Sequence, residues 1–294
     1  MSTINPQEAI DVLQKSDAKV LIASSKKRFT ELARYQTGNQ LTAEAKFEME
    51  QKHFMTLLES SPKLKNCDRL SLYMTFMIAS TNNLSFDPTM KEMYVIPRGN
   101  KAVPSIQAMG ELKLRLAAGQ IKHVDSPIIV MEGDIFKPKL NSNGEKVVEW
   151  EKKIPNASTK IIGCFIRIVK VNGAVDYEWM LEDDIERLKG FSKRNNGGAG
   201  ANALYSSHNG GVDPGFLRTK MIKHAFKAYP SAPVIAPKTL SIAFESDKET
   251  PDAEAAPKSN DDMYGTIEQV AEVLSSTPLN NNSDASEATA PTMF

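Results

Sequence analysis

Basic residues are concentrated between positions 187 and 230, where eight of them accompany one acidic residue, Asp213. A helix is predicted near the end of this stretch, and one side of it carries Lys220, Lys223, His224 and Lys227. The other side is apolar and carries Ile222, Ala225, Phe226 and Tyr229. A helix with a basic exposed face favours phosphate binding, because phosphate contacts supply most of the sequence-independent affinity for nucleic acids.

Residues that could support catalysis form weaker patterns. The glycine run within 192–212 contains no Gly-Lys-Ser/Thr sequence, so it is not a nucleotide-binding P-loop. Asp183, Asp184 and Glu186 leave open a metal-dependent nuclease, although acidic residues are also common in the first turn of a helix. The four histidines lack the spacing of a metal site. We therefore expect no catalytic residue, no metal and no cofactor.

The chain of 294 residues has a formal net charge of zero, but its charges are unevenly distributed. Residues 246–294 carry ten acidic and two basic residues, which leaves 26 acidic and 34 basic residues in 1–245. A basic body with an acidic tail favours a polyanion-binding protein. The two cysteines exclude a disulfide scaffold. No apolar run is long enough to cross a membrane, and residues 1–10 lack a secretory signal, so we expect a cytoplasmic protein.

Apolar periodicity and helix-end signals predict helices at 41–60, 68–80, 105–118, 182–189 and 214–229. Gly119 is expected to end the third of these, because glycine commonly follows the last helical residue. Asp213 and Pro214 form a typical start for the last helix, and Pro230 is expected to end it.

Strands are predicted at 92–97, 128–136, 147–154, 160–171 and 174–180. Asn172-Gly173 predicts a tight turn between the last two strands, since both turn positions need positive φ. We expect 128–136 to pair with 147–154. Tyr177 and Trp179 alternate with Asp176 and Glu178, which predicts one buried apolar face and one exposed polar face.

Residues 246–294 are rich in Ser, Asn, Ala, Pro and Asp, so most of this tail is expected to be disordered. Tyr264, Ile267, Val270 and Leu274 recur in it at helical spacing. We therefore divide the chain into a core at 1–245 and a tail that carries a short amphipathic helix at about 262–275 for docking on a partner.

Three segments, in the same order, resemble the RecT and Red-beta family of phage recombination proteins. Asp87–Pro97 resembles a family segment with a proline, an acidic residue, a tyrosine and a strand that ends in proline. Val103–Gln120 resembles the next helix and its glycine-glutamine end, and Leu217–Lys223 resembles the basic helix that closes the family core. The likeness covers about residues 70–230, more than half of the chain.

The resemblance implies a non-catalytic, ATP-independent single-strand annealing protein that forms rings or helical filaments on DNA. It implies an α+β fold, a small twisted antiparallel sheet with a β-hairpin packed against helices. By family position it assigns DNA binding to Lys91, Arg218 and Lys220. Together with the clustering of charge, this predicts phosphate contacts by Lys91, Arg98, Lys101, Lys113, Lys189, Lys193, Arg194, Arg218, Lys220, Lys223 and Lys227.

The expected partners are single-stranded DNA, the annealed duplex intermediate and further copies of the chain, in the cytoplasm of a bacterial host and without a membrane. The tail is expected to recruit a single-strand binding protein or an exonuclease. Two other classes stay open: a metal-dependent nuclease, and a structural oligomer whose basic face contacts a sister subunit.

We predict that a chain truncated after Glu245 still anneals complementary oligonucleotides, because the acidic tail would repel DNA. Annealing of labelled strands by the full and truncated chains tests this. Loss of annealing on naked strands would contradict the assignment of the tail to partner recruitment.

Overall fold

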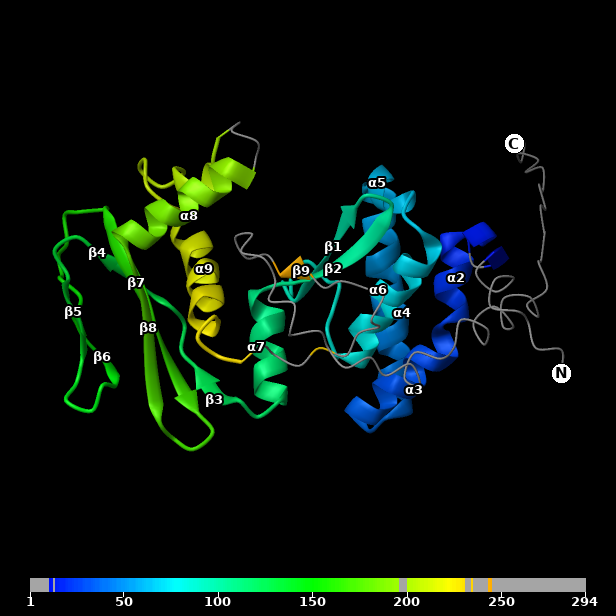
Figure 1. Ribbon diagram of the computed structural model, residues 1–294. Coiled ribbons are helices and arrows are strands. Elements are labelled where there is room, and N and C mark those ends of the chain that lie inside the picture. Colours follow the sequence, from blue (N-terminus) through cyan, green and yellow to red (C-terminus); the bar gives the residue numbers. More distant parts are fainter. Residues whose placement is uncertain (1–10, 13, 196–199, 231–233, 235–242, 245–294) are drawn as a thin grey trace, which may run out of the picture.

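The computed structural model is an elongated α+β protein in which two packed bodies lie on either side of helix α7 (Ala108–Ala117) (Figure 1). It describes residues 11–12, 14–195, 200–230, 234 and 243–244. The predicted tail and its short helix lie outside the described residues. Within the described part of the chain, no helix is long and apolar enough to cross a membrane.

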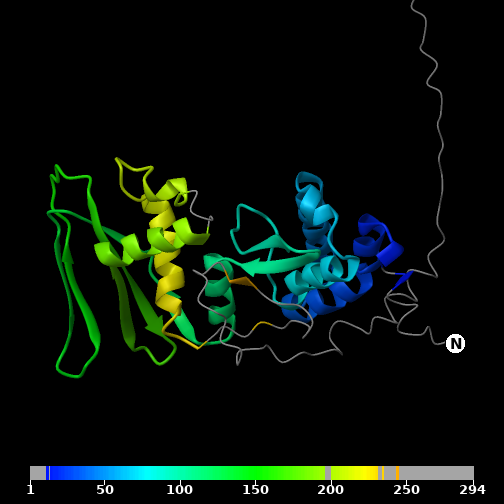
Figure 2. The same ribbon diagram turned by 45° about the horizontal axis from the view of Figure 1, so that its top comes forward.

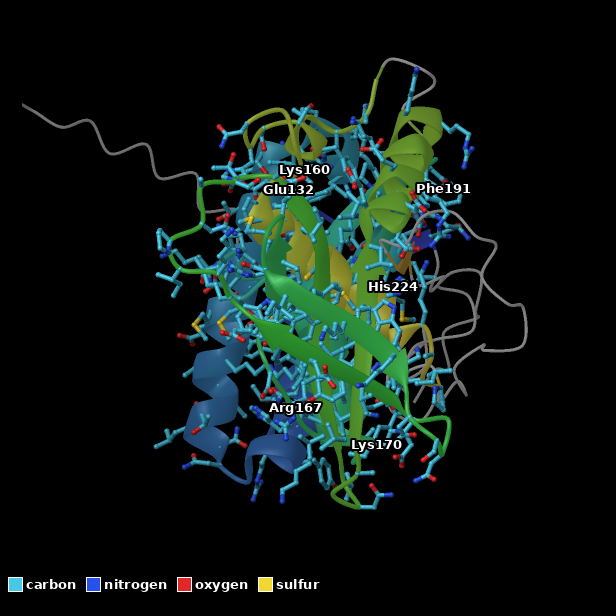
Figure 3. All side chains as sticks on the ribbon, turned by 90° about the vertical axis from the view of Figure 1, so that its left-hand side faces the viewer. Glu132, Lys160, Arg167, Lys170, Phe191 and His224 are labelled. Carbon is cyan, nitrogen blue, oxygen red and sulfur yellow. The ribbon has the colours of Figure 1, made fainter. Side chains whose placement is uncertain are left out.

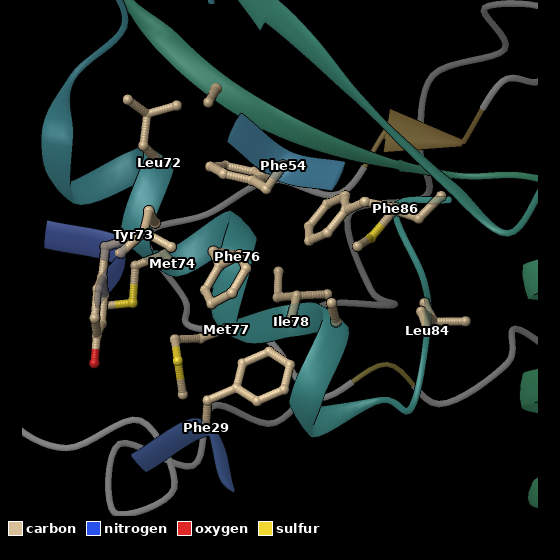
Figure 4. Close-up of a cluster of buried hydrophobic side chains, with 14 of the residues drawn as sticks. Phe29, Phe54, Leu72, Tyr73, Met74, Phe76, Met77, Ile78, Leu84 and Phe86 are labelled. Atoms are coloured by element: carbon tan, nitrogen blue, oxygen red, sulfur yellow. The ribbon is translucent and has the colours of Figure 1, made fainter. Parts of the chain in front are cut away.

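The first body is formed by the helices α2 (Ala18–Ser24), α3 (Lys26–Thr37), α4 (Gln40–Ser60), α5 (Pro62–Lys65) and α6 (Arg69–Thr81). Helix α6 is buried along most of its length. The ring of Phe76 contacts four other phenyl rings at centroid separations of 5.0–6.1 Å, those of Phe29, Phe47, Phe54 and Phe86. Figure 4 shows Phe76 at the centre of this cluster. The first core is therefore built around α6.

A small sheet covers α6 and leads into α7. Strands β1 (Met93–Arg98) and β2 (Lys101–Ile106) form an antiparallel hairpin, and β2 also pairs with β9 (Ala243–Phe244). The backbone of Ala102 is bonded to α6 twice, because it accepts from the Thr75 hydroxyl at 3.0 Å and donates to Ser71 Oγ at 2.9 Å. These buried bonds fix the hairpin on the helical body.

The second body is a four-stranded sheet with helices on one face. Strand β7 (Ile161–Lys170) forms antiparallel pairs with β3 (Ile121–Val124), β4 (Ile128–Met131) and β8 (Val175–Leu181). Helices α8 (Glu182–Asn195) and α9 (Pro214–Phe226) follow. A separate hairpin of β5 (Ile135–Leu140) and β6 (Lys146–Glu151) lies on the opposite side of the sheet from α9 (Figures 1 and 2).

The α+β class and most of the predicted elements are confirmed. Helices α4, α6, α8 and α9 and the β7–β8 hairpin lie where the sequence places them. Helix α8 continues beyond 189 to Asn195, and α9 ends at Phe226, before the predicted Tyr229. Helices α2 and α3 were not predicted, although Leu21, Ile22, Phe29 and Ala33 supply a buried apolar face.

The predicted helix at 105–118 begins later than expected. Ser105 and Ile106 are the last residues of β2 and pair with Tyr94 and Met93. Long-range pairing in the sheet therefore overrides the local helical pattern at these two positions. The predicted end is correct, because Gly119 has φ of 65° directly after the last turn.

The predicted strand at 128–136 is two strands. Gly133, with φ of 95°, interrupts it, so β4 joins β7 in the main sheet and only β5 pairs with β6. A positive φ is accessible to glycine without steric cost, which makes this turn possible. The predicted pairing is correct for the second half alone.

The two faces of β8 are opposite to the expectation. Glu178 and Met180 are buried on the α9 side, whereas Tyr177 and Trp179 are only half-buried on the hairpin side. Both faces of the sheet are covered, so alternation along one strand does not identify the more buried face. Glu178 is satisfied by Lys146 Nζ at 2.5 Å.

Arg115 of α7 joins the two bodies. Its side chain is only 3% exposed and donates to Glu111 and Gln120 at 3.1 and 3.0 Å. It also donates to the carbonyl oxygens of Phe226 and Pro230, at the end of α9, at 3.4 and 2.5 Å. Burial lowers the pKa of Arg115, and Glu111 opposes that shift. The buried guanidinium thereby fixes the end of α9 on α7.

We predict that Arg115→Met lowers the free energy of unfolding by about 2–4 kcal/mol, because it leaves Glu111 and two carbonyl groups unsatisfied. Urea denaturation measures the change. Arg34→Met, at an exposed arginine of α3, is the control. Equal stability of the two variants would show that the Arg115 bonds contribute nothing to the packing of α7 and α9.

Candidate nucleic-acid interface

Helix α9 presents three lysines on the side that faces away from its core. Leu217, Met221 and Ala225 are buried against the sheet, whereas Lys220 and Lys223 are half-exposed. Lys227, at the C-terminal cap, is exposed. The helix begins as predicted, with the Asp213 side chain accepting from the backbone of Phe216 at 2.7 Å. The predicted division into a basic and an apolar side is confirmed.

The lysine side of α9 is turned toward the start of α7. Lys223 Nζ donates to Oε1 of Gln107, the residue between β2 and α7, at 3.4 Å. Gln107 is itself buried and held by the backbone and hydroxyl of Ser105. The basic side of α9 therefore lies next to the junction between the two bodies.

Helix α8 adds two arginines beside α9. Arg187 and Arg194 both lie over the ring of Phe191, with guanidinium carbons 5.9 and 4.4 Å from its centroid. Arg187 also acts electrostatically on His224 of α9, as Lys227 does. Figure 3 shows Phe191 and His224 on the same side of the protein. We call Arg187, Arg194, Lys220, Lys223 and Lys227 the basic surface.

His224 lies within this region but adds little charge to it. Burial is the largest effect on its ring and lowers the pKa, and Lys227 and Arg187 lower it further, against Asp184 and Glu178. A lowered pKa favours the neutral ring at pH 7. The positive charge of the basic surface therefore comes from its arginines and lysines.

Two predicted residues of α8 lie on another side of the helix. Lys189 lines a pocket of about 310 Å³ with Lys160, Glu182 and His208, and it pairs with Glu186 at 3.5 Å. Lys193 is exposed, one helical turn beyond Lys189. Lys189 and Lys193 therefore lie on a different side of α8 from Arg187 and Arg194.

Arg218 is also separated from the α9 lysines. Its side chain is exposed, and its Nε donates to the carbonyl oxygen of Pro127 at 3.3 Å. The helical position of Arg218 directs it toward the loop before β4. The structure therefore brings Lys220, Lys223 and Lys227 together and places Arg218 elsewhere.

Lys113 belongs to a network of charges between α4, α7 and β1. Its ammonium pairs with both oxygens of Glu92 at 3.0 Å, and Glu92 is 5% exposed. Glu92 also accepts from the backbone of Ser85, and the buried Glu50 accepts from the backbone of Phe86. Desolvation by burial and the nearby Lys113 lower the pKa of Lys46 to about 8, while Glu50 and Glu92 raise it. Lys113 thus has a structural partner.

The remaining predicted residues lie at and before the β1–β2 hairpin. Arg98 and Lys101 lie opposite each other in the strand register, at the exposed end of the hairpin. Lys91 is exposed in the turn before β1. Lys101 is the first of the six residues of β2 and Gln107 follows the last, so the two are about 20 Å apart along the strand. The hairpin end is therefore a second, separate group of cations beyond the α7 junction.

The carboxylates proposed for the alternative nuclease have local partners. Asp184 accepts from the backbone of Leu181 at 3.1 Å and pairs with Arg187 at 3.4 Å. Glu186 pairs with Lys189. In the described part of the chain, no group of three or more His, Cys, Asp or Glu residues is arranged to hold a metal ion.

A model of the RecT family matches residues 48–211, from the middle of α4 to the loop before α9. The chain belongs to the RecT family. The resemblance seen in the sequence is therefore confirmed, while α9 and its lysines lie beyond the matched segment.

One relative of this RecT family chain is the uncharacterized protein YqaK of Bacillus subtilis (strain 168). The two are 27% identical over 141 residues, which cover 47% of this chain and 48% of YqaK. The chain thus matches about half the length of that relative.

The residues that carry the RecT resemblance have identifiable structural roles. Glu92 is the buried partner of Lys113, and Gly110 passes so close to it that a Cβ would lie 2.2 Å from the Glu92 carbonyl oxygen. Gln120, after the turn at Gly119, accepts from Arg115. These segments therefore hold α7 in place between the two bodies.

Sequence reasoning missed Arg187 as a member of the basic surface. The available signal was spacing, because Arg187, Phe191 and Arg194 follow one another at intervals of four and three residues along one helix. It also could not detect that Glu92 neutralises Lys113, since 21 residues separate them in the chain.

We predict that the free energy of unfolding of the wild type rises relative to that of Lys46→Met as the pH is raised from 8 to about 10. The folded pKa of Lys46 is about 8, against 10.5 for the free side chain. Between these values the unfolded chain binds the proton and the folded one does not, so unfolding becomes less favourable as pH rises.

Urea denaturation of both proteins across this range measures the difference, in which other titrating groups largely cancel. Lys52→Met, at an exposed lysine of the same helix, is the control. A difference that stays constant with pH for Lys46→Met would contradict the lowered pKa.

Proposed function

We propose that this RecT family chain binds single-stranded DNA through its phosphates and anneals it to a complementary strand, as in phage recombination. The observation that carries the proposal is the basic surface. Its α8 arginines share the ring of Phe191, and Arg187 and Lys227 both act on His224. Lys223 of the same surface reaches Gln107 at the start of α7. Family membership supports the annealing role. Phosphate contacts provide affinity without selecting a base sequence, which annealing requires.

The rings near the basic surface support contact with the DNA backbone. Phe191 is covered by two guanidinium groups, and the ammonium of Lys220 lies 5.1 Å from the centroid of Phe216. Aromatic rings in many single-strand binding proteins stack on bases. Here these rings hold cations instead, so the cations are positioned for phosphates and the neighbouring bases stay available for pairing.

The proposal includes ATP independence and assembly of many copies along the strand as a ring or helical filament. The sequence has no P-loop signature, and annealing itself breaks no covalent bond. Many subunits that each bind weakly give high total affinity and still allow the strands to realign. The proposed partners are therefore single-stranded DNA, the annealed duplex intermediate and sister subunits, with a protein partner for the tail.

Within this proposal, Lys220, Lys223 and Lys227 contact phosphates together with Arg187 and Arg194. Arg98, Lys101 and Lys91 are proposed to contact the strand where it continues past the β1–β2 hairpin. Lys113 is left out of this set, because its ammonium pairs with both oxygens of the buried Glu92, whereas the ion pair of Arg187 is exposed and longer.

We predict that replacing both Lys220 and Lys223 with alanine weakens binding to all single-stranded sequences alike. The plot of log affinity against log salt should flatten by about 0.7 for each phosphate contact removed. Fluorescence anisotropy of labelled oligonucleotides at several salt concentrations measures both effects.

The double variant Lys19→Ala, Lys27→Ala is the matched control, because it removes two exposed lysines of α2 and α3. A folded Lys220→Ala, Lys223→Ala protein with an unchanged salt slope would show that α9 does not contact DNA. Loss of labelled DNA that depends on a divalent metal would instead favour the nuclease alternative.

A further inference from the structure

An aromatic pocket of about 220 Å³ opens on the face of the sheet that is turned away from α9. Its walls come from β7, β8, the β5–β6 hairpin and the loop before β4. The lining residues are Asp125, Ser126, Ile128, Val148, Trp150, Phe165, Arg167 and Tyr177. The basic surface uses none of them.

The register of the sheet builds this pocket. Phe165 and Arg167 lie two residues apart on β7, so their side chains point to the same face, and Arg167 is paired with Tyr177 on β8. The residues between and beyond them, Cys164 and Ile166, face α9 and belong to the second core. The pocket and the basic helices therefore lie on opposite faces of one sheet.

The β5–β6 hairpin supplies the other wall. Trp150 of β6 contacts the ring of Phe165 edge-on at 5.9 Å, and Phe136 of β5 stacks on the same ring at 5.5 Å. Phe165 is 5% exposed, whereas Trp150 and Tyr177 are half-buried. The pocket thus has a closed aromatic floor between two rings that remain partly accessible.

Hydrogen-bonding groups converge on one side of the pocket. Arg167 pairs with Asp125 at 3.1 Å, and the ring of His123 lies 2.7 Å from the other oxygen of Asp125. Burial raises the pKa of Asp125, but the bonds from Arg167 and His123 hold it below its usual value. Figure 3 shows Arg167 low on the sheet, away from Phe191 and His224. The side therefore offers both donors and acceptors.

Arg218 provides a cation beside the pocket. Its Nε donates to the carbonyl oxygen of Pro127, which stands between the lining residues Ser126 and Ile128. Among the described residues, no carboxylate lies within ion-pair distance of Arg218. An exposed guanidinium bonded to the loop that forms one wall of an aromatic pocket suits a ligand that joins a flat ring to a phosphate.

We propose that the pocket holds one unstacked base of a bound DNA strand, with Arg218 on the adjoining phosphate. The base would lie between Trp150 and Tyr177, and its edge would meet Arg167 and Asp125. This site rests on the proposed DNA-binding function and adds to it, because it fixes one base of the strand while the others stay free to pair.

The pocket tryptophan offers a direct test. The chain has two tryptophans, so Trp179→Phe leaves Trp150 as the single emitter. Oligothymidylate should quench this emission. An abasic strand of the same length should bind, as seen by anisotropy, and leave the emission unchanged. Equal quenching by the two strands would overturn the proposal.

Variants of the pocket provide a second measurement that does not depend on tryptophan emission. Tyr177→Leu should weaken binding of oligothymidylate at least about fivefold, the lower range for loss of one stacked base, and change abasic binding little. Tyr35→Ala, at a 91% exposed tyrosine of α3, should change neither. Circular dichroism confirms that each variant is folded.

The possible outcomes distinguish failure of the pocket proposal from failure of the proposed DNA-binding function. If neither strand binds the wild type, the proposed function fails, and the pocket proposal fails with it. If both strands bind the wild type and folded Tyr177→Leu with unchanged affinity, only the pocket proposal fails. A folded Tyr177→Leu protein that loses self-association instead of base-dependent binding would assign the pocket to a side chain of another copy.

Discussion

The buried guanidinium of Arg115 is the interaction on which the arrangement of the two bodies depends. It lies on α7, which contributes Leu114 to the first core and Ala108 to the second. From there it bonds the carbonyl groups at the end of α9. A buried charge is tolerated only when it is paired and hydrogen-bonded, so α7 and the end of α9 must stay together. The direction of the α9 lysines follows from this constraint.

The cations of the two predicted DNA-binding helices differ from Lys113 and Arg115 in how far their partners are buried. Lys113 and Arg115 face buried carboxylates or carbonyl groups and stabilise the fold. Arg194 and Lys220 lie over aromatic rings and remain accessible to solvent, and Arg187 combines such a ring contact with an exposed ion pair to Asp184. A cation–π contact orders a side chain without neutralising it, which leaves the charge for a phosphate. Charge count alone does not distinguish these groups.

The sheet of the second body separates two kinds of surface. On one face, β7 and β8 pack on α9 and so place its lysines near the α7 junction. On the other face, Phe165 packs under the β5–β6 hairpin beside an accessible pocket. Successive residues of a strand point to opposite faces, so ten residues of β7 serve both surfaces. The aromatic pocket and the α9 helix therefore lie on opposite faces of one sheet.

Features that depend on a few neighbouring residues could be predicted from the chain alone. Helical spacing, the Asp213-Pro214 start, the Gly119 end and the Asn172-Gly173 turn all act within a few residues, so α9, the end of α7 and the β7–β8 hairpin were predictable. Which side chains meet across long separations in the chain depends on how the elements pack. Glu92 neutralises Lys113, Arg218 bonds to Pro127 and does not lie beside Lys220, and α9 buries the face of β8 that carries Glu178. These pairings depend on packing between elements, which no local pattern in the chain encodes.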